Sequence, residues 1–121
     1  MIRVLVVDDE SDLAEYLADE LKVEGFRAET AYDGVEAVIK LIDEKWDVAL
    51  FDIRMPKLDG ISALRIIKRI KPDMPIVMFT GQAGRGDIIT SSELGAYACL
   101  LKPVSIDQLK KTIHLIMHTN S

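Results

Sequence analysis

The chain lacks the features that mark secreted and membrane-spanning proteins. Its 121 residues include a single cysteine, Cys99, which excludes an intramolecular disulfide and fits a reducing compartment. No apolar stretch approaches the roughly 20 residues that a membrane-spanning helix needs. The first residues, Met1 to Leu5, run directly into an apolar strand pattern and lack the layout of a signal peptide. We therefore expect a cytoplasmic protein that is not inserted in a membrane.

An excess of basic charge is missing as well. The formal net charge is −5 at pH 7, whereas a general nucleic-acid-binding surface needs a basic face, so no direct nucleic-acid binding is expected. Repeats, linkers and low-complexity tracts are also absent from the sequence. Hydrophobic residues make up 49% of the chain, which is ordinary for a globular protein. These facts predict one domain that covers residues 1–121.

The chain contains a regular alternation of strand and helix patterns, repeated five times. Four continuously apolar runs are typical of strands buried on both faces, and a more polar run predicts a strand at a sheet edge. The predicted strands lie at about residues 2–7, 27–31 (the polar one), 47–51, 76–79 and 97–101. Short connections in this order predict an α/β fold, (βα)5, with a parallel sheet and helices on both faces.

Helical spacing of apolar residues follows each strand pattern. The residues that share one face are Leu13, Leu17 and Leu21; Val35, Val38, Ile39 and Ile42; Ile61, Leu64 and Ile67; and Leu109, Ile113 and Ile116, while the fourth helix is predicted at about residues 87–94. Gly25 is placed to end the first helix, and Ser105 and Gln108 have capping-box spacing for the fifth. Residues 81–86, with three glycines, predict a flexible loop.

Polar residues follow four of the apolar strands at the point where each strand ends. Asp8 and Asp9 follow the first strand, Asp52 the third, Thr80 the fourth and Lys102 the fifth. Ligands of open α/β sheets bind outside the carboxyl ends of the strands, so these residues belong to one edge of one sheet. Three carboxylates, a hydroxyl and an ammonium gathered there predict a site for a divalent metal and a phosphoryl group.

The chemistry of these side chains suggests a division of roles. Mg²⁺ prefers hard oxygen ligands, and a bound cation would relieve the repulsion among Asp8, Asp9 and Asp52. Asp52 lies on a different strand from the other two aspartates and is our candidate nucleophile, since aspartate carboxylates form acyl phosphates. Lys102 can supply a point charge to phosphoryl oxygens, and Thr80 can supply a hydroxyl donor.

Each of these residues also has a structural explanation when it is taken alone. An aspartate after a strand is often a helix cap or a turn residue. A threonine is a good strand former, and a lysine before proline is usually solvated. The functional interpretation rests on the coincidence of four strand ends that present the parts of one site.

These residues resemble the receiver domain of two-component response regulators, and the resemblance covers the whole chain. Four pieces occur in order and at the spacing of that family. They are Val6-Val7-Asp8-Asp9-Glu10; Asp52-Ile53-Arg54-Met55-Pro56 with Asp59-Gly60; Phe79-Thr80-Gly81; and Gly95-Ala96 leading to Lys102-Pro103.

The resemblance implies a flavodoxin-like fold with strand order 2-1-3-4-5 and a role in phosphorelay signal transduction. It implies that Asp52 accepts a phosphoryl group from a sensor histidine kinase or a phosphotransfer protein. It further implies that Asp9, Asp52 and the backbone carbonyl of Arg54 bind Mg²⁺, with Asp8 holding the metal shell through water. Thr80 and Lys102 would contact the bound phosphoryl group, and the Lys102-Pro103 peptide bond is expected to be cis.

The resemblance also implies partners and a limited kind of catalysis. The domain would catalyse only its own phosphorylation and dephosphorylation, and so would not be an enzyme with a separate substrate. Phosphorylation would reshape the surface of the fourth helix, fifth strand and fifth helix. A downstream effector protein or domain, or a second copy in a homodimer, would bind that surface.

The chain departs from the family pattern beside the site. Many receivers have an aromatic residue three positions before the site lysine, and here that position is Cys99, while the nearest aromatic is Tyr97. The chain therefore lacks, at this position, the aromatic residue of the usual threonine-plus-tyrosine switch. Arg54 and Gln82, two positions past the candidate nucleophile and the threonine, flank the expected path of the attacking water; such positions tune phosphoryl lifetime in receivers.

Two other patterns carry weaker functional signals. The glycines of residues 81–86 resemble a phosphate-binding loop but lack the order of a G-x-G-x-x-G or G-x-x-x-x-G-K motif. His114 and His118 have the i, i+4 spacing of a metal site, yet they share a helix face with Lys110, which favours a solvated basic face.

Two other functions compete with the phosphorylation switch. One is a receiver-like binding module that works without phosphorylation, an alternative that Cys99 leaves open. The other is a phosphatase of the aspartyl-phosphate type, although the segment after Asp52 lacks the second aspartate of a D-x-D-x-T motif.

Overall fold

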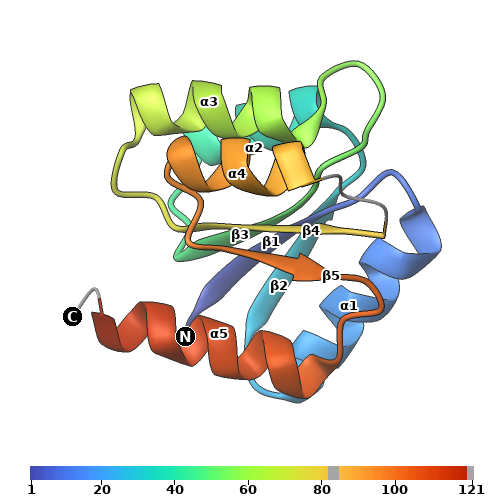
Figure 1. The fold of residues 1–121 in the computed structure, drawn as a ribbon. Coiled ribbons are helices and arrows are strands. Elements are labelled where there is room, and N and C mark those ends of the chain that lie inside the picture. Colours follow the sequence, from blue (N-terminus) through green and yellow to red (C-terminus); the bar gives the residue numbers. More distant parts are fainter. Residues whose placement is uncertain (82–84, 120–121) are drawn as a thin grey trace.

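The computed structural model describes residues 1–81 and 85–119 as a five-stranded parallel sheet between two layers of helices (Figure 1). The strands are β1 (Arg3–Val7), β2 (Arg27–Ala31), β3 (Val48–Asp52), β4 (Ile76–Thr80) and β5 (Ala98–Leu101), and the helices are α1 (Ser11–Val23), α2 (Gly34–Asp43), α3 (Gly60–Ile70), α4 (Arg85–Glu93) and α5 (Ile106–Thr119). The strand order is β2-β1-β3-β4-β5. The predicted flavodoxin-like (βα)5 architecture is therefore confirmed, with β2 at a sheet edge as its polar sequence indicated.

The sheet separates two hydrophobic cores because alternate residues of a strand point to opposite faces. In β1, Val4 and Val6 belong to the core beneath α1 and α5, whereas Leu5 and Val7 belong to the core beneath α2 and α3. Every residue of β3 and β4 is buried. The central strands are thus held on both faces, which fixes the positions of the residues at their carboxyl ends.

The continuously apolar run of β5 was expected to be buried on both faces, and that expectation is wrong. The β5 residues are only partly buried, and Leu101 is 62% exposed. The reason is topological, since β5 pairs only with β4 and forms the second edge of the sheet. An apolar run therefore does not distinguish a central strand from an edge strand whose outer surface is exposed.

The apolar face predicted for α2 is also not the face that the helix buries. Val35, Ile39 and Ile42 are each more than two-fifths exposed, and the helix instead buries Gly34, Ala37 and Leu41. A side chain at Gly34 would collide with the backbone carbonyl of Leu58, so the helix meets its neighbour through its smallest residues. Close approach of the backbone at Gly34 therefore constrains the orientation of α2, beside the burial of Leu41.

The predicted helix ends are largely confirmed. Gly25 has a positive φ of 95° and ends α1, with the Phe26 N–H donating to the Leu21 carbonyl in a Schellman arrangement. The Ser105 hydroxyl accepts a hydrogen bond from the Gln108 N–H, as the capping-box spacing predicted. The fourth helix begins at Arg85 rather than near residue 87, so the end of the predicted glycine loop is helical.

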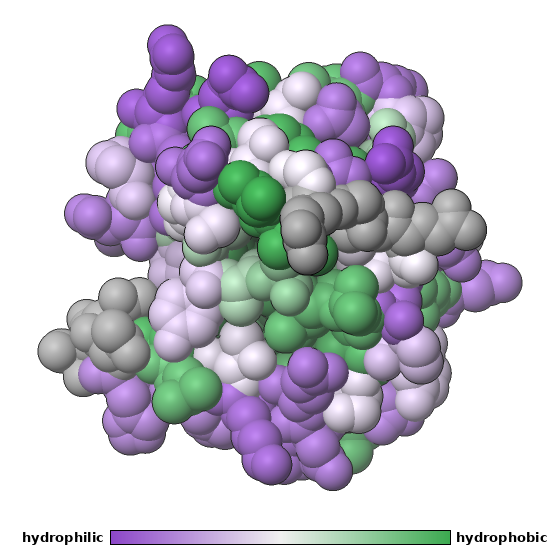
Figure 2. Space-filling model, viewed as in Figure 1, coloured by the Kyte–Doolittle hydropathy of each residue, from purple (hydrophilic) through white to green (hydrophobic). Residues whose placement is uncertain are grey.

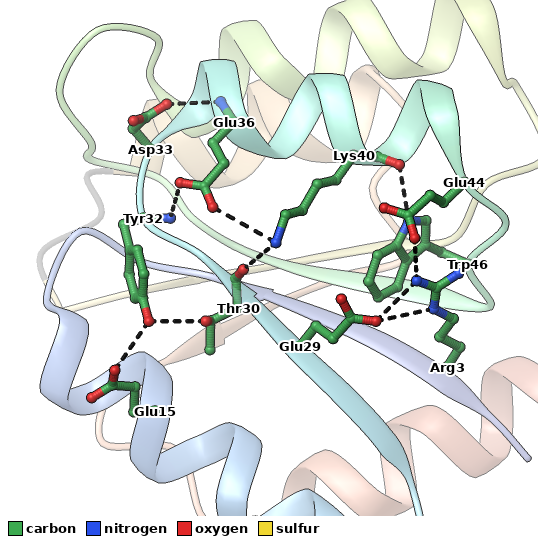
Figure 3. Close-up of polar contacts among 10 residues, drawn as sticks. All are labelled: Arg3, Glu15, Glu29, Thr30, Tyr32, Asp33, Glu36, Lys40, Glu44 and Trp46. Carbon is green, nitrogen blue, oxygen red and sulfur yellow. Dashed lines mark hydrogen bonds and ion pairs between the residues drawn. The ribbon is translucent and has the colours of Figure 1, made fainter.

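A polar network fixes the edge strand β2 to neighbouring elements (Figure 3). The Arg3 guanidinium bonds to Glu29 of β2 and to Glu44 after α2, and it lies 4.0 Å from the centre of the Trp46 ring. Lys40 of α2 donates to the Thr30 carbonyl of β2. These contacts connect β2 to α2 and to the start of β1.

Gly60 offers a direct test of how the fold positions the site. A Cβ at this position would meet the backbone carbonyl oxygen of Asp52 at the end of β3. We expect Gly60→Ala to lower the free energy of unfolding by about 1–3 kcal/mol, because the start of α3 must move away from the strand. Gly86→Ala is the matched control, since nothing lies within 4 Å of the added carbon, and it should be neutral or slightly stabilising. Urea unfolding measures the free energy of unfolding of both variants. An equal loss of stability in the two would contradict a special close contact at Gly60.

Candidate functional site

The carboxyl ends of the sheet strands bring the predicted site residues to one edge of the molecule. Asp52 is the last residue of β3, and Thr80 is the last residue of β4. Asp8 directly follows β1, and Lys102 directly follows β5. The Lys102 N–H donates to the Thr80 carbonyl at 2.9 Å, which continues the β4–β5 pairing up to the site.

Three carboxylates converge at this edge. One oxygen each from Asp8, Asp9 and Asp52 lies within 4.8 Å of the others. Asp8 is completely buried and Asp52 is 5% exposed, whereas Asp9 is exposed. The Glu10 N–H donates to Asp8 Oδ1 at 2.9 Å and fixes the orientation of that carboxylate. The group is therefore an ordered set of hard oxygen donors that is open to solvent on the side of Asp9.

Lys102 supplies the positive charge that faces this group. Its ammonium lies 2.8 Å from Asp8 Oδ2, 3.5 Å from Asp52 Oδ2 and 3.7 Å from Glu10 Oε1. The ammonium is also 5.2 Å from the centre of the Phe79 ring. The Lys102-Pro103 peptide bond is cis, as the resemblance implied. The predicted proximity of Lys102 to the carboxylates is thus confirmed, and Glu10 is an additional partner that strand-end reasoning did not include.

Burial and repulsion set the protonation behaviour of the site. Burial raises the pKa of Asp52 to about 6, and the negative charge of Asp8 adds to this effect, while Lys102 opposes it. Burial by itself lowers the pKa of Lys102, but the hydrogen bond to Asp8 and the charge of Asp52 outweigh it, so that pKa is raised overall. Lys102 therefore remains an ammonium at neutral pH, and Asp52 is mostly ionised there.

The loop from β3 to α3 places the backbone of Arg54 beside Asp52. The Ile53 N–H donates to the Phe79 carbonyl, and the Gly60 N–H donates to the Ile53 carbonyl, so the loop is anchored at both ends. Asp59 caps α3 by accepting from the Ser62 N–H at 2.8 Å. The exposed Arg54 side chain pairs with Asp87 of α4, at 3.0 Å from nitrogen to oxygen. Nothing in the sequence pattern indicated this ion pair.

Several sequence candidates lie away from the site. The rings of His114 and Phe26 pack with their centres 5.8 Å apart, and His114 is exposed, which agrees with a solvated helix face. Cys99 is partly buried against the core beneath α2 and α3, and burial raises the pKa of its thiol, with a further contribution from the charge of Asp87. Residues 82–84, which include Gln82 and one of the three glycines of the suggested phosphate loop, lie outside the described residues.

The donor set fits a hard divalent cation. Carboxylate and carbonyl oxygens are the ligands that Mg²⁺ accepts, and Asp8, Asp9 and Asp52 supply the carboxylates. Burial, and after it the charge of Asp8, raise the pKa of Asp52 despite the opposing charge of Lys102. A bound cation would oppose this rise by favouring the ionised carboxylate.

Comparison with known proteins identifies the family of this chain. Residues 4–114 match the model of the family described as the response regulator receiver domain. The chain is 38% identical over 121 residues to a transcriptional regulatory protein, a CpxR homolog of Haemophilus influenzae, covering all of this chain and 52% of that protein. The chain therefore belongs to the receiver domain family of two-component response regulators.

Solved structures show the same likeness. A CheY-like receiver domain protein from Methanospirillum hungatei superposes with a TM-score of 0.93 at 30% identity, over 99% of this chain and 97% of that one. The response regulator TrrA from Thermotoga maritima, solved in complex with Mg²⁺-BeF, gives a TM-score of 0.87 at 32% identity, over 96% and 99% of the two chains.

The chain spans about half the length of the curated relatives it matches, 52% of the CpxR homolog and 49% of the PrrA protein of Mycobacterium tuberculosis. Among the residues that the structure describes, no helix has the length and apolar character needed to cross a membrane.

The protonation of Asp52 predicts how stability changes with pH in the absence of metal. Its pKa is about 6 in the folded chain and near the ordinary 3.8 in the unfolded chain, so the folded state binds more protons between these values. Stability from this group therefore falls as the pH rises through that window. We expect Asp52→Asn to be more stable than the wild type by about 1–3 kcal/mol at pH 7, and the difference to shrink toward zero as the pH falls to about 4.

Urea unfolding at a series of pH values, with a chelator present, measures this difference. The exposed Glu93→Gln is the control, because it lies in α4 away from the carboxylates and should not show that pH dependence. A difference between the wild type and Asp52→Asn that stays constant from pH 4 to pH 8 would contradict the raised pKa.

Proposed function

We propose that this receiver domain is a Mg²⁺-dependent phosphorylation switch with Asp52 as the phosphoryl acceptor. The observation that carries the proposal is the buried Asp52 carboxylate at the end of β3, beside Asp8 and 3.5 Å from the Lys102 ammonium. The donor would be the phosphohistidine of a sensor histidine kinase or of a phosphotransfer protein. Residues 1–121 would act as one receiver unit.

The side chains of the site suit a transfer to a carboxylate. Asp52, with a pKa of about 6, is mostly ionised at neutral pH and needs no separate base. Its oxygen would form the new bond to phosphorus while the phosphorus–nitrogen bond of the phosphohistidine breaks, and the imidazole would leave with the electron pair. Lys102 would turn from its present carboxylate partners toward the phosphoryl oxygens, and the Thr80 hydroxyl would donate to them.

Asp8, Asp9, Asp52 and the backbone carbonyl of Arg54 would hold the magnesium ion. When bound, Mg²⁺ offsets the charge of the carboxylates and of the incoming phosphoryl group. Asp9 is the exposed member of the group, and it would complete the ligand set from the solvent side. Asp8, which is buried and fixed by the Glu10 N–H, would act on the metal shell through water.

The exposed surface suggests where a partner would bind. Exposed large apolar side chains lie on α4, on or just before β5, and on α5; they are Ile88, Ile89, Tyr97, Leu101 and Leu115. Figure 2 shows hydrophobic residues over α4 and beside the end of β5. We infer that an effector protein or domain, or a second copy of the chain, covers this surface after phosphorylation. The location of this protein in the cytoplasm stays a prediction.

The chain is a signalling domain and not an enzyme of the usual kind. Catalysis of its own phosphorylation and dephosphorylation is part of the proposal. A binding module that works without phosphorylation would not need carboxylates converging on a lysine, so the arrangement around Asp52 does not favour that alternative.

Intact-mass spectrometry after incubation with acetyl phosphate and Mg²⁺ tests the proposal. We expect one phosphoryl adduct on the wild type, because Asp52 offers an ionised carboxylate beside Lys102. The adduct should be absent from Asp52→Asn and should disappear when the metal is chelated. Lys102→Ala should keep the acceptor but form adduct about 10-fold or more slowly. A full adduct on Asp52→Asn would contradict the assignment of the acceptor.

Metal binding gives an independent prediction. We expect saturating Mg²⁺ to raise the thermal midpoint of the wild type by about 2–8 °C, because the ion binds the folded carboxylate set and not the unfolded chain. Asp9→Asn should lose most of this shift, whereas Asp12→Asn, an exposed acid in the first turn of α1, should keep it. Retention of the full shift by Asp9→Asn in differential scanning fluorimetry would show that the cation binds elsewhere.

A further inference from the structure

Helix α4 is held to the rest of the molecule by few contacts. Among its described side chains, at residues 86–93, only that of Ser91 is buried, and the hydroxyl of Ser91 has no hydrogen-bond partner. The apolar residues Ile88 and Ile89 are 39% and 48% exposed. By contrast, α1 buries Ala14, Leu17, Ala18 and Leu21. A helix without an apolar buried face depends on other contacts for its position.

The Arg54–Asp87 ion pair is the side-chain contact that connects α4 to the site. Within the described part of α4, Asp87 is the one residue whose side chain takes part in a hydrogen bond or ion pair with another element. Its partner Arg54 lies two residues after Asp52, in the loop that would supply a metal ligand. The two side chains border a hollow that is also lined by Asp59 and Ser62 of the α3 start. The position of α4 and the loop next to the acceptor are therefore directly linked.

The geometry of this pair makes it sensitive to charge on Asp52. The Arg54 side chain is 67% exposed and long, so it can reorient without disturbing the core. A phosphoryl group adds up to two negative charges and oxygens that arginine binds in a bidentate manner. An exposed ion pair is weak, and the new group would compete for Arg54 against a single carboxylate. Loss of Arg54 would leave Asp87 without its counter-charge and α4 without its connection.

We propose that the Arg54–Asp87 pair is a latch that transmits phosphorylation of Asp52 to α4. In the unphosphorylated chain the pair holds α4 against the β3–α3 loop. Phosphorylation draws Arg54 to the phosphoryl oxygens, the pair opens, and α4 is released. Many receivers have an aromatic residue in this role, and its position is occupied here by the half-buried Cys99. The latch would serve that role instead. This inference rests on the proposed acceptor role of Asp52.

Coupling of this kind must act in both directions. A partner that binds the exposed apolar residues of α4 and displaces Asp87 would free Arg54 for the phosphoryl group. Phosphorylation and partner binding would then favour each other through this one ion pair.

Hydrogen–deuterium exchange of the α4 amides tests the latch. Beryllium fluoride with Mg²⁺ serves as a stable substitute for the phosphoryl group, and its binding to each variant is followed by ¹⁹F NMR in the same samples. In the wild type we expect beryllium fluoride to speed exchange in α4 by about two- to fivefold, the effect of losing an exposed ion pair. Asp87→Asn should show this faster exchange without beryllium fluoride and should change little when it is added.

Further variants separate the latch from a general weakening of α4. Glu93→Gln removes an exposed acid from the same helix and should behave as the wild type. Arg54→Gln should resemble Asp87→Asn, and the double variant should be no faster than either single variant, because both remove one interaction. Additive effects, or slow α4 exchange in Asp87→Asn, would overturn the latch.

The same samples distinguish the two levels of the proposal. If the wild type gives no ¹⁹F signal of bound beryllium fluoride, the proposed phosphorylation site itself fails. If beryllium fluoride binds the wild type and α4 exchange does not change, the site stands and the latch is wrong. Loss of beryllium fluoride binding in Asp87→Asn would also overturn the latch, since Asp87 would then belong to the acceptor site.

Discussion

The interaction on which the site depends is the contact of the Lys102 ammonium with two buried carboxylates. Asp8 and Asp52 lie at the ends of neighbouring central strands, where burial and mutual repulsion make two negative charges costly. Lys102 reaches both, at 2.8 and 3.5 Å, from the end of the edge strand β5. Burial and the charge of Asp8 nevertheless keep the pKa of Asp52 raised. The unphosphorylated site therefore favours the binding of a cation beside these carboxylates.

The sheet order explains how one site can have a stable part and a movable part. Asp8 and Asp9 follow β1 and Asp52 ends β3, and both strands are covered by helices on both faces and cannot shift without disturbing both cores. Lys102 follows β5, which is half exposed and pairs with one neighbour only. Helix α4, which lies next to β5 and α3 (Figure 1), buries little. The proposed acceptor, Asp52, is thus held by the central strands, while Lys102 and α4 lie on the side of the molecule that buries less.

Much of this arrangement could be predicted from the sequence, because it follows from local rules. Apolar runs that end in Asp8, Asp52, Thr80 and Lys102 fix the positions of those residues once the sheet is known to be parallel. The burial of α2 could not be predicted from its larger apolar residues, since Gly34 determines how closely the helix packs. The Arg54–Asp87 pair was missed because it joins a loop to a helix without apolar periodicity. Such contacts depend on tertiary geometry that no local pattern records.

The most direct test of the central claim is to identify the residue that carries the phosphoryl group. Reduction of the phosphorylated protein with borohydride converts an aspartyl phosphate to homoserine, and peptide mass spectrometry then locates the converted residue. The account predicts homoserine at position 52 alone, and only in protein phosphorylated with Mg²⁺ present. Homoserine at position 8 or 9, or a stable phosphoryl adduct that borohydride does not convert, would contradict the assignment of Asp52 as the acceptor.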